Sequence, residues 1–515
     1  MKITRRRTVL ASAAALCATA LALTGCTAST PKSTTATAAK FSTLTVMAPY
    51  LSTQAPPADN PVGTALDKVI GTKLDVTWVP NSSYGDKTNI TLAGSDIPDV
   101  MVIQGKDSGF VSNAEAGAFW DLTDYLKDYP NLKTNEPAVQ EASSVNGKVY
   151  GIFRARDVMR TSVMVRKDWL KKLGLAMPKT TADLLKVAKA FTDDDPDGDG
   201  KKDTYGVVIP KWPGGFATNS PYDAIETWYG AGNDWYKTGG KLEPSFTNPK
   251  WIDALSYEKK LVPYMNPDYA TLDSVNWNQP FLTGKGGIII DTYSRARQID
   301  KLLAQQDPNT YQNMVQVTGN LVGPSGTMYA LPTPGYSGFL AIPKSSVKTV
   351  SQLKGVLSIL NKMNSKQAQI IMNNGLEGQN FTVKDGRAVA ITSPDATNLQ
   401  NIVASYAQLG TNVNGSKFYP PAQANAYDQQ VYDAEQATMA ADTKHAVYNP
   451  AAAFVSKTYT QEGATLDNII VDARLKYISG QISLDQLKAA IQQWKTSGGS
   501  QVVSEINALY KKSKK

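Results

Sequence analysis

Residues 180–209 read TTADLLKVAKAFTDDDPDGDGKKDTYGVVI and carry three signals in succession. Thr180 can cap a helix together with Asp183, and apolar side chains then recur at helical spacing as far as Phe191. An acidic loop follows, and the apolar residues 205–209 have the composition of a buried strand. The stretch therefore predicts a helix joined to a strand through an acidic loop, which is a unit of α/β architecture.

The acidic loop has the ligand spacing of a calcium-binding loop. Carboxylates occupy its first, third, fifth and ninth positions, and a glycine occupies the sixth. Because four carboxylates this close together repel one another, a cation is expected to neutralise them. The twelfth position is Gly206 instead of glutamate, so we expect a structural calcium site, with a solvated acidic turn as the alternative. The expected ligands are Asp195, Asp197, Asp199, the carbonyl of Lys201, and Asp203.

Composition places the chain among globular proteins of more than one domain. Its 515 residues are 42% hydrophobic and 19% charged, with a formal charge of +8. Four basic residues at positions 2, 5, 6 and 7 lie in a leader, and without them the 53 basic residues fall to 49 against 45 acidic ones. The mature chain is thus close to neutral, and its charge gives no reason to expect nucleic acid as a partner.

The beginning of the chain has the pattern of a secretion leader. A basic start precedes an apolar run from Val9 to Leu23, which is short for a membrane span and typical of a signal peptide. Residues 23–26 read LTGC and resemble the lipobox of bacterial lipoproteins. This resemblance implies a signal peptide over 1–25, cleavage before Cys26, and acylation of Cys26, palmitate included. An ordinary leader with a chance cysteine is the alternative.

The residues after Cys26 indicate how the body is attached. Residues 26–40 are rich in Ser, Thr and Ala without apolar periodicity, so we expect a flexible tether. Several acyl chains would give stable anchoring to the extracytoplasmic face of the cell membrane. The only other cysteine is Cys17 in the leader, so the body has no disulfide.

Strand-like and helix-like segments alternate in the first third of the body. Residues 44–46 begin a strand, residues 61–70 have helical spacing, residues 74–78 alternate as on a half-buried strand, and residues 99–103 form a buried run. This alternation favours α/β architecture with parallel strands, in which ligands bind on loops at the carboxyl ends of the strands.

Several segments together resemble motifs of one protein family. They are Gly94–Val100, Asn146–Ile152, Arg166–Gly174 with Pro178–Thr180, Asp195–Gly206, Gly284–Ile288, Asn374–Gly378 with Lys384–Gly386, and Leu466–Tyr510. The chain resembles the extracellular solute-binding proteins of family 1, in the long lipoprotein branch that serves ABC importers of sugars and oligosaccharides. It departs from the family pattern at Phe153, which replaces a usual proline, and at Thr204, where some members add a carboxylate.

The resemblance implies a two-lobed α/β fold like that of class II periplasmic binding proteins, with the ligand cleft between the lobes. The hinge would consist of three crossing segments, expected near Arg156, Lys285 and Gly338. The N-terminal lobe would then hold residues 41–156 and 285–338, and the C-terminal lobe residues 157–284 and 339–515. The resemblance also implies structural Ca²⁺ on the acidic loop.

Candidate ligand contacts follow from the chemistry of sugar recognition. Aromatic rings cover the apolar faces of sugars, and polar groups bind the hydroxyls. Core packing of the aromatic residues and salt bridges between lobes are the alternatives. The candidates are Arg154, Arg156, Asp157, Trp212, Trp228, Trp235, Trp277, Asp291, Tyr293 and Arg295, whereas Trp169 and Trp494 fall on helical core faces.

The residues argue for binding and against catalysis. Nucleophilic catalysis with a histidine base is disfavoured, since His445 is the single histidine and the body has no thiol. We therefore expect a monomeric, non-enzymatic subunit that captures a carbohydrate and presents it to the transmembrane subunits of an ABC permease. A secreted glycan-active hydrolase with a carboxylate pair is the alternative; an adhesive surface lipoprotein would show repeats, and none is visible.

Overall fold

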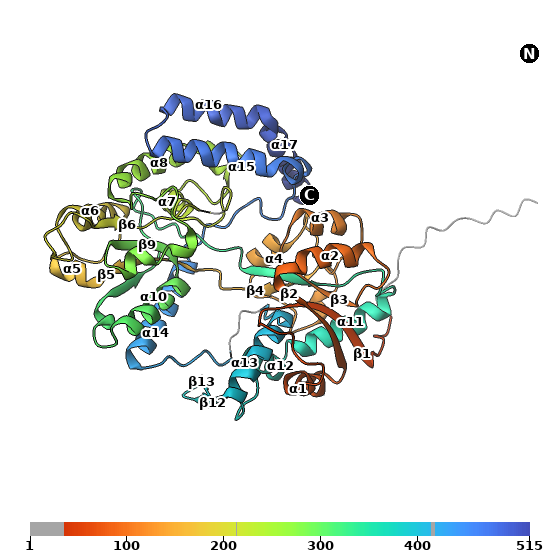
Figure 1. Cartoon of the computed structure of the whole chain (residues 1–515). Coiled ribbons are helices and arrows are strands. Elements are labelled where there is room, and N and C mark those ends of the chain that lie inside the picture. The colour runs from red at the N-terminus through yellow and green to blue at the C-terminus, as the bar shows by residue number, and fades with distance from the viewer. Residues whose placement is uncertain (1–35, 213, 414–417, 515) are drawn as a thin grey trace, which may run out of the picture. The chain divides into compact units, whose positions relative to one another are not determined.

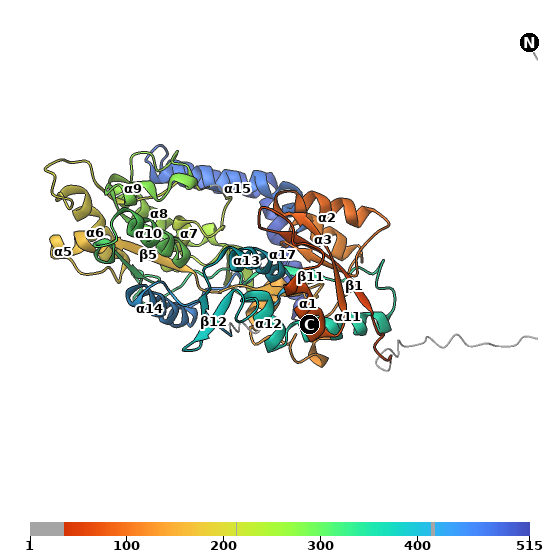
Figure 2. The same cartoon turned by 60° about the horizontal axis from the view of Figure 1, so that its bottom comes forward.

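The computed structural model describes residues 36–212, 214–413 and 418–514, so the predicted signal peptide and Cys26 lie outside the described residues. Residues Ala38–Lys515 form one compact unit. Along the described chain, no helix combines the length and the apolar character needed to cross a membrane. The unit contains two larger sheets, each with its own helices (Figures 1 and 2). We call the sheet that contains β1 and its helices the first lobe, and the sheet that contains β5 and its helices the second lobe.

The sheet of the first lobe has five strands. Their order is β2 (Lys73–Pro80), β1 (Thr43–Tyr50), β3 (Val100–Ile103), β11 (Tyr336–Ala341) and β4 (Ile152–Ala155). Strand β1 is parallel to β2 and β3, whereas β11 is antiparallel to β3 and β4. All residues of β3 are buried, as expected for a strand covered on both faces.

Helices and a hairpin surround this sheet. Helix α1 begins after Asn60, whose side chain accepts a hydrogen bond from Gly63 N, and Gly71, which has φ 71°, caps its C-terminal end. The further elements are α2 (Tyr84–Ala93), α3 (Ser108–Glu115), α4 (Pro137–Ser143), α11 (Val350–Met363), α12 (Lys366–Asn373), α13 (Pro394–Tyr406), and the hairpin of β12 (Phe381–Lys384) and β13 (Arg387–Ala390); α1 itself spans Pro61–Ile70.

The sheet of the second lobe has four strands and separates two layers of core. Its order is β10 (Val315–Thr318), β5 (Thr161–Arg166), β9 (Gly286–Thr292) and β6 (Tyr205–Val207). Strand β9 aligns Ile290 with Val163 and Ile289 with Met164. The first pair belongs to one hydrophobic cluster and the second pair to another, because successive side chains of a strand point to opposite faces.

Helix α6 (Thr181–Asp193) confirms the helix predicted from the opening stretch. The Thr180 hydroxyl accepts a hydrogen bond from Asp183 N at 3.1 Å, and the Asp183 carboxylate accepts one from Thr180 N at 3.0 Å. The other elements of the second lobe are α5 (Lys167–Lys172), α7 (Pro221–Trp228), β7 (Trp235–Thr238), β8 (Lys241–Pro244), α8 (Pro249–Leu261), α9 (Gln279–Leu282), α10 (Tyr293–Gln306), α14 (Ala426–Thr443), α15 (Lys457–Ile478), α16 (Leu484–Trp494) and α17 (Ser500–Ser513).

The chain passes between the lobes at residues 156–160, at 332–335, and between Ala422, which bonds to Ala388 of the first lobe, and Asn425, which bonds to Tyr311 of the second. Hydrogen bonds hold these crossings together: Arg156 N donates to Gly335 O at 2.9 Å, and Ala155 N donates to Thr411 O at 2.7 Å. The predicted crossings near Arg156 and Gly338 thus lie at or beside crossings of the structure.

The predicted crossing near Lys285 is wrong, and with it the assignment of two segments to lobes. Strands β9 and β10 lie in the sheet with β5, so most of 285–338 belongs to the second lobe. Residues 339–413 belong instead to the first lobe, where Phe339 and Val413 share one core. The apolar run of β9 fits the buried position in either sheet, so its pattern did not reveal which sheet it joins.

Candidate functional site

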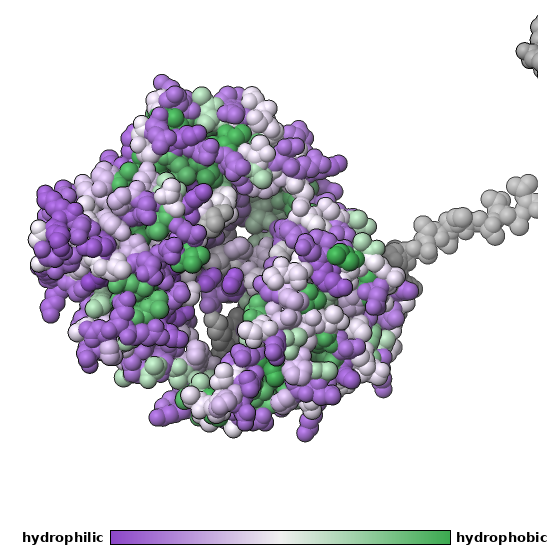
Figure 3. All heavy atoms as spheres, viewed as in Figure 1, coloured by the Kyte–Doolittle hydropathy of each residue, from purple (hydrophilic) through white to green (hydrophobic). Residues whose placement is uncertain are grey.

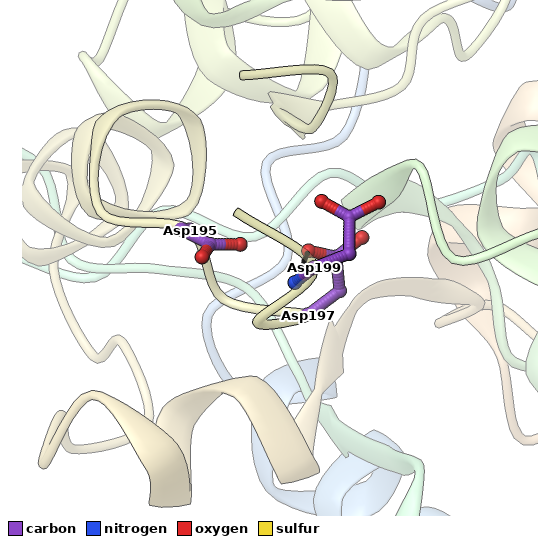
Figure 4. Close-up of side chains that lie close together, drawn as sticks. All are labelled: Asp195, Asp197 and Asp199. Atoms are coloured by element: carbon purple, nitrogen blue, oxygen red, sulfur yellow. Dashed lines mark hydrogen bonds between the residues drawn. The ribbon is translucent and has the colours of Figure 1, made fainter. Parts of the chain in front are cut away.

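The acidic loop connects α6 to β6 and brings three predicted ligands together (Figure 4). One carboxylate oxygen from each of Asp195, Asp197 and Asp199 lies within 4.8 Å of the others. Asp195 has φ 48°, and its carboxylate accepts hydrogen bonds from Gly198 N at 2.9 Å and Gly200 N at 3.1 Å. The loop therefore folds around its first carboxylate, and hard oxygen donors of this kind suit Ca²⁺.

Two lysines balance the charge of this loop. Lys201 Nζ lies 2.9 Å from Asp199 Oδ2, and Lys285 Nζ pairs with Asp203 and lies 4.0 Å from Asp197 Oδ2. The hydrogen bond from Lys201 lowers the pKa of Asp199. Asp203 is thus held by Lys285 from the start of β9, outside the group of three carboxylates.

A cleft lies between the lobes and consists of three adjoining pockets of about 190, 510 and 420 Å³. The smallest shares Thr333 and Tyr336 with the 420 Å³ pocket, which in turn shares Asp234 and Asn449 with the largest. The space-filling view is hollowed where the two lobes meet (Figure 3). A cleft of this size and mixed polarity suits a small organic ligand.

Aromatic side chains of the second lobe line the largest pocket. Trp235 at the start of β7 is 8% exposed and is the one predicted tryptophan that lines the cleft. Phe216, Phe246 and Trp494 join it, with the rings of Phe246 and Trp494 at 4.8 Å and those of Phe216 and Phe246 at 5.4 Å. Trp494 does lie in the core as predicted, yet it also contributes to the pocket wall.

Two carboxylates lie among these rings. Burial raises the pKa of Asp234 to about 7, with a further contribution from the charge of Asp467, and burial raises the pKa of Asp467 to about 6. The Tyr459 hydroxyl donates to the Asp467 carboxylate at 2.9 Å, and Asn449 Nδ2 donates to Asp234 Oδ2 at 2.9 Å. These acceptors in an apolar wall can bind ligand hydroxyls.

The first lobe contributes the opposite wall of the largest pocket. Lys106 Nζ donates to Ala142 O at 2.8 Å, to Ser144 O at 3.0 Å, and to Ala452 O. Asn146 N donates to Ala453 O at 2.8 Å. These bonds fasten the segment before α15 to the first lobe, so this segment forms part of the cleft and joins both lobes.

The small pocket contains two more predicted residues. Arg156 and Asp291 line it together with Arg160. Asp291 forms an ion pair with Arg295, and the Arg295 guanidinium lies 4.2 Å from the Trp277 ring centroid. Arg295 therefore positions Asp291 at the pocket wall without lining the pocket itself.

The remaining predicted contacts lie elsewhere. Trp228, Trp277 and Tyr293 are at most 2% exposed and belong to the core. Trp228 Nε1 donates to Asn320 Oδ1 at 2.9 Å and Trp277 Nε1 to Val208 O at 3.0 Å, so the packing alternative holds for them. The others lie outside the cleft: Trp212 packs on Trp277 and donates to Thr218, Asp157 lines a pocket beside the first crossing, and Arg154 lines a pocket of the first lobe.

Sequence reasoning missed several residues of the cleft. Phe216, Asp234, Tyr336, Tyr448, Tyr459 and Asp467 line it. One available signal was the spacing of Tyr459 and Asp467, eight residues apart on one helix, which places them on similar sides of α15. The remainder come from separate loops, and no local pattern connects them.

The chain is similar to known proteins over most of its length. The model of the bacterial extracellular solute-binding protein family matches residues 52–370. Lipoprotein LipO of Bacillus subtilis (strain 168) is 44% identical over 476 residues, which cover 92% of this chain and 93% of LipO. The polygalacturonan/rhamnogalacturonan-binding protein YtcQ of the same organism is 32% identical over 467 residues, 90% of each chain.

Solved structures show the same fold. An HMO-binding, ABC-transporter-associated solute-binding protein of Bifidobacterium longum infantis superposes with TM-score 0.69 at 17% identity, over 91% of this chain and 98% of that one. The EF-hand mutant of the Streptococcus pneumoniae substrate-binding protein FusA, in complex with fructo-nystose, gives 0.59 at 19% identity over 92% and 99%. The predicted two-lobed α/β architecture is confirmed. This chain belongs to the bacterial extracellular solute-binding proteins.

Proposed function

We propose that this protein captures an oligosaccharide in the cleft by closing its two lobes over it, and delivers the sugar to the permease of an ABC importer. The observation that carries the proposal is the largest pocket, where Trp235, Phe216 and Tyr459 surround the carboxylates of Asp234 and Asp467. Aromatic faces next to hydroxyl-binding acceptors are the chemistry that sugars require. The relative YtcQ, named as a polygalacturonan/rhamnogalacturonan-binding protein, supports the same ligand class.

Anchoring at the membrane is part of this proposal. Cys26 follows a leader with a lipobox-like end, and LipO carries the name lipoprotein. Acylation of Cys26 would hold the protein at the extracytoplasmic face beside its permease, and residues 27–40 would leave the lobes free to reach it.

A structural calcium ion on the acidic loop is a second part. Asp195, Asp197 and Asp199 supply three converging carboxylates, and the Lys201 carbonyl and Asp203 would complete the set after Lys201 and Lys285 release their partners. FusA was solved as an EF-hand mutant, which supports the interpretation that this fold accommodates such a loop. The ion would tie α6 to β6 and take no part in ligand binding.

A thermal-shift screen of the full chain against neutral and acidic mono- and oligosaccharides, followed by product analysis, tests whether the protein binds a sugar without cleaving it. We expect saturable stabilisation by an oligosaccharide that is recovered intact. Asp234→Asn combined with Trp235→Ala should abolish the shift. Cleavage of the sugar would instead assign Asp234 and Asp467 to a glycan-active hydrolase, since a pair of carboxylates is the machinery of such enzymes.

A further inference from the structure

A buried arginine of the first lobe has unused hydrogen-bonding capacity. Arg154 on β4 is 8% exposed, and its Nη1 donates to Ser337 O at 3.0 Å while its Nη2 donates to Gln408 Oε1 at 2.5 Å. A guanidinium carries five N–H donors. Arg154 Nε is buried and has no hydrogen-bond partner among the described residues.

The charge of Arg154 also lacks a counter-ion. In the described chain, no carboxylate lies within ion-pair distance of its guanidinium, and the residues that line the adjoining pocket include no acid. Burial, with the charge of Arg156 added, lowers the pKa of Arg154 to about 10. A buried cation without an opposite charge is costly, so a bound anion would be favoured here.

Arg154 lines a pocket of about 470 Å³ on the first lobe that shares no lining residue with the three cleft pockets. Six of the described residues in its wall carry side-chain amides. Asn373, Asn374 and Gln400 each use one end of the amide in protein hydrogen bonds, and the other end has no partner in the part of the chain that the structure describes. We call this the amide pocket.

The chemistry of the amide pocket is specific. Free amide ends offer both donors and acceptors to hydroxyl groups, and the Tyr419 ring, 6.3 Å from that of Phe381, adds an aromatic face. The guanidinium offers charge-assisted hydrogen bonds to a carboxylate. The volume accommodates a monosaccharide.

We propose that the amide pocket is a second binding site, separate from the cleft, that takes a small sugar acid through its carboxylate. The carboxylate binds the free N–H donors of Arg154, and the hydroxyls bind the amides of Asn373, Asn374 and Gln400. The pocket adjoins the crossings of the chain, because Ala155 N donates to Thr411 O at its edge. Binding there does not depend on which oligosaccharide occupies the cleft.

The test is isothermal titration calorimetry of the full chain with D-galacturonate and with D-galactose, which has the same ring without the carboxylate. We expect galacturonate to bind at least tenfold more tightly than galactose and to weaken as salt is raised. Acetate and sulfate separate a sugar-acid site from a general anion site. If either simple anion binds as tightly as galacturonate, the sugar-acid assignment is overturned.

Variants locate the site. Arg154→Gln should weaken galacturonate binding at least tenfold, Arg154→Lys should weaken it less, and Asn373→Ala, on the exposed rim, should weaken it without disturbing the bonds of Arg154. Arg156→Lys, in the small cleft pocket, is the matched control: it keeps the positive charge that acts on Arg154 and should leave galacturonate binding unchanged. Loss of galacturonate binding in Arg156→Lys but not in Arg154→Gln or Asn373→Ala would place the sugar acid in the cleft and refute the proposal.

The two proposals fail separately. Arg154→Gln should retain the thermal shift produced by the cleft oligosaccharide, and the double variant Asp234→Asn with Trp235→Ala should retain galacturonate binding. Galacturonate binding that survives both Arg154→Gln and Asn373→Ala in folded protein would show that Arg154 only fastens β4 to Ser337 and Gln408.

Discussion

At the scale of single residues, burial decides the chemistry of the cleft. Asp234 and Asp467 lie 233 positions apart in sequence, yet both have a raised pKa in the same pocket. Both carboxylates therefore take up a proton at a pH closer to neutral than exposed aspartates do. This difference makes the free energy of unfolding depend on pH.

Asp467→Asn should stabilise the protein at alkaline pH. Because the pKa of Asp467 is about 6 in the folded protein against 3.8 when exposed, the folded state holds its proton more tightly. The ionised carboxylate therefore destabilises the fold increasingly as pH rises from about 4 to above 6, and this penalty is absent below about 4. In urea unfolding, we expect the free energy of unfolding of the variant to exceed that of wild type by about 3 kcal/mol at pH 8 and to equal it at pH 4.

Asp472→Asn is the matched control, because Asp472 lies on the same helix with its side chain 70% exposed. It should change the free energy of unfolding by less than about 0.5 kcal/mol at either pH. A stability difference for Asp467→Asn that is the same at pH 4 and pH 8 would contradict a raised pKa.

The sequence predicted which side chains lie close together where those residues are neighbours in the chain. The three carboxylates of the acidic loop converge as the spacing indicated, since they lie within five consecutive positions. The prediction failed for Trp228 and Trp277, whose rings fill the core. The sequence around a tryptophan can look the same whether its ring lines a cleft or fills a core, and only the tertiary packing distinguishes the two positions.

At the scale of elements, α6, the acidic loop and β6 form one unit. The capping box of α6 and its buried face were predictable because both are local patterns. Thr204 Oγ1 donates to Phe191 O at 2.9 Å and joins the end of the loop to the helix. The position of β6 beside β9 was not predictable, since a three-residue strand carries no register signal of its own.

Calcium should stabilise this unit. A ligand that binds only the folded state adds about 2.7 kcal/mol when its free concentration is a hundred times its Kd. We expect chelation to lower the Tm of the wild-type protein by several degrees and calcium to restore it. Asp197→Asn should remove the response, whereas Asp193→Asn, on the last residue of α6 outside the spacing, should retain it. An unchanged calcium response in Asp197→Asn would exclude the loop as the metal site.

Strand β11 contains a glycine with a backbone conformation that no other residue adopts without strain. Gly338 has φ 93°, and an added Cβ would lie 2.0 Å from Ile103 O on the neighbouring β3. Gly338→Ala should therefore destabilise the protein by about 3 kcal/mol in urea unfolding. Gly326→Ala separates the strain of a positive φ from the clash of the added Cβ. Gly326 has φ 75° but open space around its Cβ position, so this variant should lose only about 1 kcal/mol of the free energy of unfolding. Equal effects of the two variants would contradict close packing of β11 on β3.

At the scale of the whole molecule, motifs distributed along the chain predicted the two-lobed fold. They did not predict which segment lies in which lobe. Strand β9 and residues 339–341 of β11 lie in the opposite lobe from the predicted one, and each strand lies between two strands that are distant in sequence. An apolar strand of six or seven residues specifies burial and not its neighbours. The cleft shares this limit, because Lys106, Tyr336 and Asp467 meet there through tertiary packing alone.

The segment between α14 and α15 joins the lobes in addition to the crossings. Val455 N donates a hydrogen bond to Asn146 Oδ1 at 3.1 Å, and Lys106 Nζ donates one to Ala452 O. When the lobes move relative to each other, this segment must either move with the first lobe or lose these hydrogen bonds. The closure that we propose would thus be a transition between two packed arrangements rather than free movement about a hinge.

The central claim is that ligand capture draws the two lobes together. Small-angle X-ray scattering of the full chain, alone and saturated with the oligosaccharide that gives the largest thermal shift, measures this directly. We expect a smaller radius of gyration in the saturated protein, and no such change in the double variant Asp234→Asn with Trp235→Ala. Superimposable profiles of the free and saturated wild-type protein would contradict capture by closure.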